Sequence, residues 1–186
     1  MRIFIALLVA FQVFNSAAQV RDLLRVQRSA VSFVSEAPLE RITAANEGVK
    51  GLLDRSARTF AVQVPIAAFA GFNAPLQREH FSENYLVSST WPNATFTGRI
   101  IETVDLLQPG IHTVRAKGTL SIRGTPQERI IPCTVEVSAE AIRVRSSFDV
   151  LLADHGIRIP RVVQQKIAAL VRVELDLFFV PDAMKP

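Results

Sequence analysis

Apolar and polar side chains alternate along most of this chain with a period of two residues. In HTVRAKGTLSIR (112–123), every even-numbered position from Val114 to Ile122 is apolar or glycine, and the odd-numbered positions are Thr, Arg, Lys or Ser. The same pattern recurs in TFAVQVPI (59–66), AIRVRSSFDVLL (141–152) and VRVELDLFF (171–179). Alternation over such lengths predicts strands with one buried face and one solvated face.

Turn-forming residues separate these runs into a series of candidate strands. Pro109-Gly110 and Arg123-Gly124 are the clearest turn signals. Strands are expected near residues 21–27, 30–36, 41–52, 57–66, 94–105, 111–123, 127–138, 141–152 and 170–180. The first two can form one bent strand, so the chain is expected to have about eight. Strands at this spacing with short turns predict an antiparallel meander that closes into a barrel.

Three segments depart from strict alternation. The parity blurs at Ile100-Ile101, within the expected strand 94–105, and a bulge or bend would explain the change. Residues 74–84 place apolar side chains at helical spacing, which predicts a short helix. Residues 160–170 begin with proline and carry an apolar helical stripe, which predicts a second helix leading into the last strand. The predicted fold is therefore all-β with short helices.

The first 18 residues have the pattern of a secretory signal. Arg2 precedes an apolar run from Ile3 to Phe14, and small residues stand at Ser16 and Ala18. The run is shorter than the roughly 20 residues that a transmembrane helix needs, whereas it suits a signal that is removed on export. Residues 1–18 are predicted to be a signal peptide, and residues 19–186 one exported domain, periplasmic or secreted.

Charge and cysteine content exclude several functions. The 21 lysines and arginines are scattered along the strands and form no block, so no nucleic-acid partner is expected. Cys133 is the only cysteine, which rules out an intrachain disulfide. It shares the parity of Ile131 and Val135 and is predicted to be a buried, unreactive thiol.

The apolar face of a barrel with about eight strands encloses a space that side chains fill or that one small ligand occupies. The chain has 12 phenylalanines but one tyrosine and one tryptophan, and phenylalanine brings apolar area with no polar atom to satisfy. The pattern leaves both a filled core and a tunnel for a long apolar ligand open. A barrel with its apolar face toward lipid also alternates, but the scarcity of Trp and Tyr counts against the aromatic girdles of such barrels.

Two groups of polar residues could carry chemistry, one before the expected strand 94–105 and one after the expected strand 141–152. His80 and Glu83 would share one face of a helix, but two ligands are fewer than the three of a catalytic zinc site. Asp154 and His155 are adjacent and could belong to a hydrolase triad, although no G-x-S-x-G motif accompanies them. Neither a metal site nor a catalytic residue is predicted.

Four segments resemble the YceI-like family, in the order in which that family has them. HFSENYLVSSTWPNATFTGRI (80–100) resembles its most telling segment, with His80, Tyr85, Trp91-Pro92 and Ala94-Thr95-Phe96 in the family's pattern. The other three segments are SFVSEAPLERITAANEGVKGLLD (32–54), AKGTLSIRGTPQERIIP (116–132) and FDVLLADHGIRIP (148–160). Arg123 departs from the pattern, because many members have His or Asn before this glycine.

The resemblance implies a closed, lipocalin-like antiparallel barrel that is secreted into the bacterial periplasm in many members and binds polyisoprenoids or related long-chain amphiphiles. The protein is therefore expected to be an exported carrier or storage protein, not an enzyme. No cofactor or metal is expected beyond a bound polyisoprenoid or fatty-acid-like ligand. Transient membrane contact and a homodimer stay open. The alternative is a structural or interaction protein with a filled core and no ligand.

Parity and the expected helix together select the ligand-binding candidates. The strand positions on the apolar face are Phe33, Phe60, Val62, Phe96, Ile122 and Phe148. In the expected helix, Phe81 and Tyr85 are predicted to point into the barrel. His80 is predicted to fix this segment or to meet the headgroup of a ligand, together with Glu79, Glu83 and Asn84.

Overall fold

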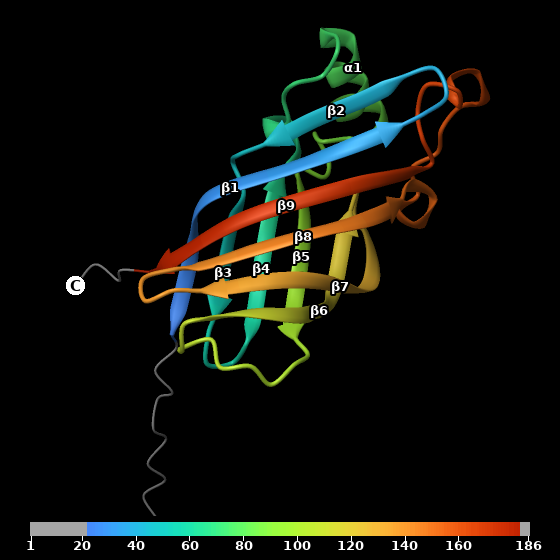
Figure 1. Cartoon of the computed structure of the whole chain (residues 1–186). Helices are drawn as coiled ribbons and strands as arrows, with labels where there is room; N and C mark the ends of the chain where they lie inside the picture. Colours follow the sequence, from blue (N-terminus) through green and yellow to red (C-terminus); the bar gives the residue numbers. More distant parts are fainter. Residues whose placement is uncertain (1–21, 183–186) are drawn as a thin grey trace, which may run out of the picture.

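The computed structural model describes residues 22–182, which form one antiparallel sheet closed into a barrel (Figure 1). The strand order is β2-β1-β3-β4-β5-β6-β7-β8-β9, and β1 also pairs with β9. Eight strands, β1 and β3 to β9, therefore complete the ring, and β2 is an additional strand on β1. The predicted closed barrel of about eight strands is confirmed. The predicted signal peptide, residues 1–18, lies outside the described residues.

The strands follow the expected segments closely. Their bounds are β1 (Leu23–Glu36), β2 (Arg41–Asn46), β3 (Lys50–Asp54), β4 (Thr59–Pro65), β5 (Asn93–Ile100), β6 (Gly110–Ile122), β7 (Thr125–Val137), β8 (Ile142–Leu151) and β9 (Leu170–Pro181). The first two expected strands are one strand, with a register shift against β9 between Val26 and Arg28. Such a bulge lets the long β1 bend around the barrel.

The expected strand 41–52 is wrong as a single strand. It is broken at residues 47–49 into β2 and β3, which lie end to end on the same side of β1. The buried Asn46 holds the break, because its side-chain nitrogen donates to the carbonyl of Pro65 at 2.7 Å and its Oδ1 accepts from the N–H of Gly48 at 2.8 Å. A polar side chain buried between strands ends the alternation there.

The parity change at Ile100-Ile101 marks the end of the strand expected over 94–105 rather than a bulge within it, and the chain bends at Glu102. Strand β5 ends at Ile100, and the last backbone bond of this edge runs from the N–H of Ile101 to the carbonyl of Arg115 at 2.9 Å. Ile100 and Leu106 are both buried, so the blurred parity reflects a loop that folds its apolar residues over the end of the barrel.

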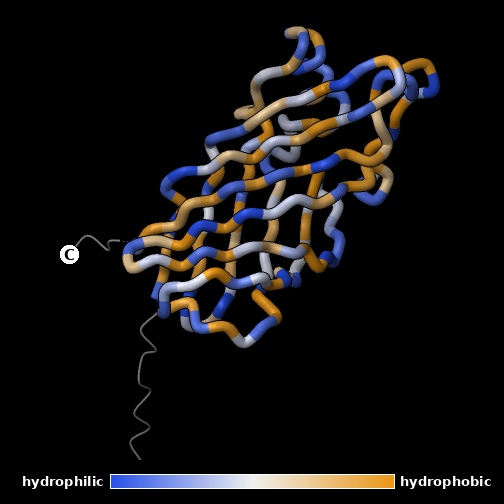
Figure 2. Tube along the Cα trace, in the orientation of Figure 1, coloured by the Kyte–Doolittle hydropathy of each residue, from blue (hydrophilic) through white to orange (hydrophobic). Residues whose placement is uncertain are grey.

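The apolar parity faces inward along the strands. Hydrophobic and hydrophilic positions alternate along the chain trace in Figure 2. In β7 the burial alternates through Ile131, Cys133, Val135 and Val137, which are all buried. The charged positions point outward, which is opposite to the arrangement of a barrel that faces lipid. None of the helices in residues 22–182 is long and apolar enough to cross a membrane.

Two facing glycines bring β5 and β6 unusually close together. Gly98 pairs directly with Gly118, and a Cβ on Gly98 would overlap the carbonyl oxygen of Lys117 and lie 2.6 Å from the Cα of Gly118. No other residue fits at this crossing, which lies where the steep strands β3, β4 and β5 meet the slanted strands β6 to β9 (Figure 1). The glycine pair therefore lets the sheet turn the corner that closes the barrel.

Residues 66–92, called the insert below, connect β4 to β5. Its ends meet, because the N–H of Ile66 donates to the carbonyl of Pro92 at 2.9 Å. It contains a 3₁₀ turn (Ile66–Ala68), the helix α1 (Pro75–Glu79) and a π-helical segment (His80–Tyr85). The helix expected over 74–84 is thus confirmed. An isolated bridge between Ala45 and Ala70 ties the insert to β2, so it covers an edge that β2 would otherwise expose.

The second expected helix, over 160–170, is wrong. The segment has only a 3₁₀ turn at Arg161–Val163, preceded by another 3₁₀ turn at Leu152–His155. A short helix needs a surface that buries its apolar stripe, and Val162 is instead 90% exposed. The backbone of this segment bonds to the β1–β2 hairpin instead, because the N–H of Leu39 donates to the carbonyl of Gln165 at 2.8 Å.

Candidate functional site

The barrel encloses a cavity of about 510 Å³. Most of its wall is apolar and comes from the inward positions of the strands, including Leu53, Val114, Val144, Val173 and Leu175. The volume lies within the roughly 300–1,000 Å³ of typical ligand pockets. The interior is therefore not packed solid, which counts against the filled-core alternative.

All nine predicted site residues lie on the wall of this one cavity. Strands supply Phe33 from β1, Phe60 and Val62 from β4, Phe96 from β5, Ile122 from β6 and Phe148 from β8. The π-helical segment supplies His80, Phe81 and Tyr85. The structure brings these residues together around one space, and their contact with a ligand stays a prediction.

Phe81 anchors the insert to the barrel. Its ring centroid lies 5.3 Å from that of Phe33, 5.4 Å from that of Phe69 and 5.1 Å from that of Phe72. Phe33 belongs to β1, whereas the other rings belong to the insert. Edge and offset contacts at these separations are favourable for aromatic rings. This cluster of four rings fixes the insert over one end of the cavity.

A second ring pair lines the cavity on strands β4 and β5. Phe60 of β4 and Phe96 of β5 have centroids 4.9 Å apart, and Val62 pairs in register with Phe96. All three side chains are only partly buried although they lie inside the barrel, because they border empty space. Apolar side chains that face a vacant space lack dispersion contacts on that side in the free protein. They can make those contacts with the hydrocarbon tail of a ligand.

Four polar side chains mark one end of the cavity: Glu40, Gln77, His80 and Lys166. They come from the β1–β2 hairpin, the insert and the loop before β9. The side-chain nitrogen of Gln77 donates to Glu40, which ties the insert to the hairpin. His80 and Lys166 are exposed, so this end is the mouth through which the apolar interior meets solvent.

The cavity wall near the mouth includes residues that the sequence analysis did not select, among them Val163, Lys166 and Ile167. Phe69 and Phe72 were likewise missed as site residues. An inward-pointing strand position is visible from its parity, but loop positions have no period. The Oγ of Ser35 accepts from the N–H of Ala168 at 2.9 Å, a contact across 133 residues that no local pattern announces.

Tyr85 lies at the boundary with a second, polar hollow of about 380 Å³. This hollow is lined by Asn84, Tyr85, Arg123, Gly156, Ile157 and Arg158. Burial raises the pKa of the Tyr85 hydroxyl, which therefore stays a neutral phenol at ordinary pH. Tyr85 presents an apolar ring to the main cavity and borders the polar hollow at the same time.

Arg123, which departs from the family pattern, lies in the tight turn between β6 and β7. Arg123 and Gly124 have φ of 51° and 69°, as a two-residue hairpin with two left-handed positions requires. Asn suits such a position better than arginine does. Two contacts of the guanidinium offset this unfavourable backbone conformation. It donates to the carbonyl of Gly156 at 2.5 Å, and its Cζ lies 5.9 Å from the centroid of the Trp91 ring in a cation–π contact.

The residues considered for catalysis and metal binding do not form a reactive group. His155 is fully buried, and its Nδ1 lies 3.0 Å from the carbonyl oxygen of Thr125, so it joins a 3₁₀ turn to β7. Asp154 is exposed. Within residues 22–182, no group of three or more His, Cys, Asp or Glu side chains could share a metal ion.

Cys133 lies on the inner face of β7 and is buried, as predicted. Burial raises the pKa of its thiol, so the reactive thiolate is scarce at neutral pH. The thiol contributes to the cavity wall as a small apolar group.

The model of the YceI-like domain matches residues 24–179, nearly all of the described chain. The chain belongs to the YceI-like family. The identification agrees with the resemblance of the four segments, and the match begins at β1 and ends within β9. A comparison with curated proteins found no match.

Solved structures of this family share the fold. A polyisoprenoid-binding domain from Saccharophagus degradans, implicated in plant cell wall breakdown, matches with a TM-score of 0.73 at 18% identity, over 87% of this chain and 99% of that domain. BcnA from Burkholderia cenocepacia matches with a TM-score of 0.67 at 17% identity, over 81% and 95%. The YceI protein of Campylobacter jejuni matches with a TM-score of 0.54 at 12% identity, over 68% and 75%. At these identities the likeness shows the YceI-like fold.

Proposed function

We propose that this YceI-like protein is an exported carrier or storage protein that holds a long-chain isoprenoid or a related amphiphilic lipid inside its barrel. The cavity of about 510 Å³ carries the proposal, because its wall is mostly apolar and its four charged or amide-bearing side chains lie together at the mouth. The similar domain from Saccharophagus degradans is described as polyisoprenoid-binding, which supports the same class of ligand.

The arrangement suits an amphiphile better than a plain hydrocarbon. The strand walls offer a tail mostly apolar contacts over the depth of the cavity, whereas Gln77, His80 and Lys166 offer hydrogen-bond donors at the mouth. A ligand with a polar head would therefore bind with its tail inward and its head at the mouth.

The magnitudes allow useful affinity without a charged anchor. Burying about 500 Å² of tail surface at about 25 cal/mol/Å² would contribute roughly 12 kcal/mol. Association costs on the order of 4–15 kcal/mol in lost freedom. Because these terms nearly balance, affinity is expected to rise with the length of tail that the cavity accepts.

A carrier function is favoured over an enzymatic one. The polar side chains at the mouth come from three separate segments, and the buried His155 bonds to a backbone carbonyl rather than to a nucleophile. Export is supported by the charged start, apolar run and small residues of residues 1–18. Removing residues 2–18 should leave the protein in the cytoplasm, and fractionation of cells that produce the two forms tests this expectation.

The decisive experiment is solvent extraction of the purified protein followed by mass spectrometry. A long-chain lipid is expected at close to one molecule per chain. Val62→Phe, which extends a ring into the cavity from β4, should lower the lipid content. Gln63→Phe is the matched control, because the neighbouring position on the same strand is exposed and lies outside the cavity wall.

Val173→Phe repeats the test from β9, a different part of the wall. Urea titrations of all variants show which of them are folded. Absence of stoichiometric lipid from the wild-type protein, together with no uptake of added polyprenol by delipidated protein, would overturn the proposal. Equal lipid content in folded Val62→Phe, Val173→Phe and Gln63→Phe would place the ligand outside this cavity.

A further inference from the structure

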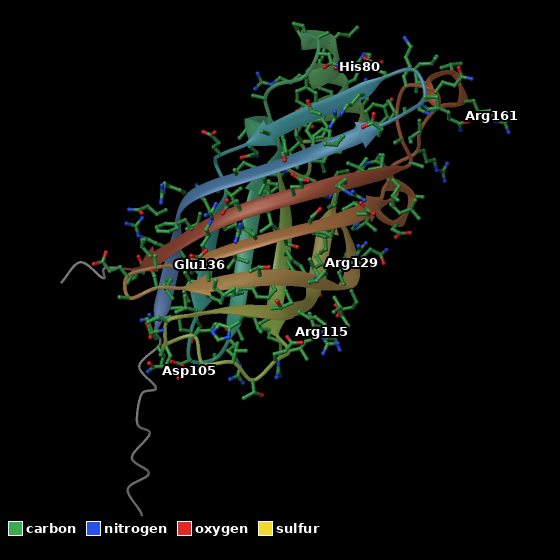
Figure 3. All side chains as sticks on the ribbon, viewed as in Figure 1. His80, Asp105, Arg115, Arg129, Glu136 and Arg161 are labelled. Atoms are coloured by element: carbon green, nitrogen blue, oxygen red, sulfur yellow. The ribbon has the colours of Figure 1, made fainter. Side chains whose placement is uncertain are left out.

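The loop that forms one side of the mouth carries only positive charge. Residues 156–169, called the mouth loop below, contain Arg158, Arg161 and Lys166 and no carboxylate. All three side chains are exposed. Lys166 lies on the cavity wall, and Figure 3 shows Arg161 projecting at the outer tip of the molecule. The mouth loop therefore presents an unbalanced positive charge beside the entrance to the cavity.

Exposed apolar side chains surround the same loop. Val162 is 90% exposed, and Leu39, whose N–H bonds to Gln165 of the loop, is 67% exposed. At the base of the loop, Leu151 and Leu170 form a cross-strand pair and are 39% and 52% exposed. Four of the ten exposed large apolar side chains in the described part of the chain therefore gather at the mouth loop. Exposed apolar side chains that cluster in this way beside a cavity mouth are typical of a surface that binds a partner or a membrane.

The absence of regular helix in the mouth loop fits an outward-facing role. Val162 follows Arg161 directly, so an apolar and a cationic side chain project together from one 3₁₀ turn. Glu40 is the acidic residue on the cavity wall at this end, and the ion pairs of residues 22–182 include none with Arg158, Arg161 or Lys166. The cations of the mouth loop are therefore available to an external anion.

We propose that the mouth loop docks the protein onto an anionic lipid surface, with the mouth of the cavity toward the bilayer. Val162 and Leu39 would enter the interfacial layer, while Arg158, Arg161 and Lys166 would meet anionic headgroups. Docking in this orientation opens the cavity to the membrane, so a lipid tail passes between bilayer and barrel without crossing water. The transfer step rests on the proposed function, whereas the docking does not.

Charge decides between an anionic bilayer and other occupants. Each basic residue close to an anionic surface strengthens binding by roughly fivefold, so three should give on the order of a hundredfold preference for anionic over neutral vesicles. A second copy of this chain would bring the same positive loop against the first or would need an acidic face opposite it. The preference should weaken as salt is added, because exposed charges are screened.

The test is co-sedimentation of delipidated protein with vesicles of phosphatidylcholine alone and of phosphatidylcholine mixed with phosphatidylglycerol. Binding is expected on the mixed vesicles only. Arg161→Gln combined with Lys166→Gln should reduce it at least tenfold, as should Val162→Asp. Lys117→Gln combined with Arg145→Gln is the charge control, because both residues are exposed on barrel strands.

Leu107→Asp is the apolar control, because Leu107 is 52% exposed in the loop that contains Asp105, far from Arg161 in Figure 3. Equal binding to both kinds of vesicle, or equal loss in the loop and control variants, would overturn the docking proposal. It would also be overturned if Val162→Asp converts a dimer into a monomer and the wild type ignores vesicles, since a second copy would then cover this face. If the protein binds vesicles but yields no lipid on solvent extraction and takes up no added polyprenol, docking is supported and the carrier function is refuted.

Discussion

Replacement of Phe81 by alanine should loosen the insert and destabilise the protein. Phe81 contacts Phe33, Phe69 and Phe72 with ring centroids 5.1–5.4 Å apart, and these contacts join the insert to β1. Removing the ring leaves the other three facing a void that the rigid strand β1 cannot fill. The predicted effect is therefore a loss of stability together with earlier opening of residues 66–92.

The magnitude follows from the burial of the ring. Replacing a buried phenylalanine with alanine costs about 3–5 kcal/mol. Phe81 is only partly buried because it borders the cavity, so the lower end, about 3 kcal/mol, is expected. For a chain of this size, each kcal/mol lowers the melting temperature by about 2–4 °C, which gives a drop of about 6–12 °C.

Urea titration of delipidated wild-type and variant proteins measures the free energy of unfolding without a contribution from bound lipid. Leu76→Ala is the matched control, because Leu76 belongs to the same insert and is 56% exposed. It should change stability by no more than about 0.5 kcal/mol. Hydrogen exchange of the insert should accelerate in Phe81→Ala and not in the control. If the two variants lose the same stability, the ring cluster does not anchor the insert and the reasoning fails.

Two further predictions concern the barrel wall. Gly98→Ala should destabilise the protein by more than about 3 kcal/mol or prevent folding, because its Cβ would overlap the carbonyl of Lys117. The control is Gly48→Ala, which should fold normally because the nearest contacts of its Cβ are at 3.5 Å. Comparable urea midpoints for the two variants would disprove the close crossing of β5 and β6. The Arg143 guanidinium holds the pKa of Asp176 below its usual range. Because the folded-state pKa is depressed, this stabilisation is present above the unfolded value of about 3.9 and is lost as the pH falls through the folded value. Asp176→Asn should flatten the fall in stability below about pH 4, and an unchanged acid limb in thermal melts would contradict the assignment.

The sequence predicted the barrel because an inward position on a strand is a local property. Val62, Phe96 and Phe148 could be assigned to the interior from parity alone, since adjacent side chains on a strand point to opposite faces. The same reasoning failed for the strand expected over 41–52. A buried Asn46, bonded to the carbonyl of Pro65, interrupts it, and that bond depends on a partner 19 residues away.

The helix expected over 160–170 failed for a related reason. Its apolar stripe satisfied the helical period, but a stripe forms a helix only when a surface receives it, and Val162 faces solvent instead. The mouth could not be foreseen either. Glu40, Gln77 and Lys166 meet there because the barrel closes, and closure brings together segments with no shared local pattern.

By itself, the sequence determined which side chains face inward, since alternation is set by the geometry of each strand, and it carried the segments that mark the YceI-like family. Only the tertiary structure decided that the inward side chains leave a vacant space and where that space opens. Whether side chains that face each other across the barrel make contact depends on the circumference of the barrel and on the insert that covers its end. Both are set by contacts between residues far apart in the chain, such as Gly98 with Gly118 and Phe81 with Phe33.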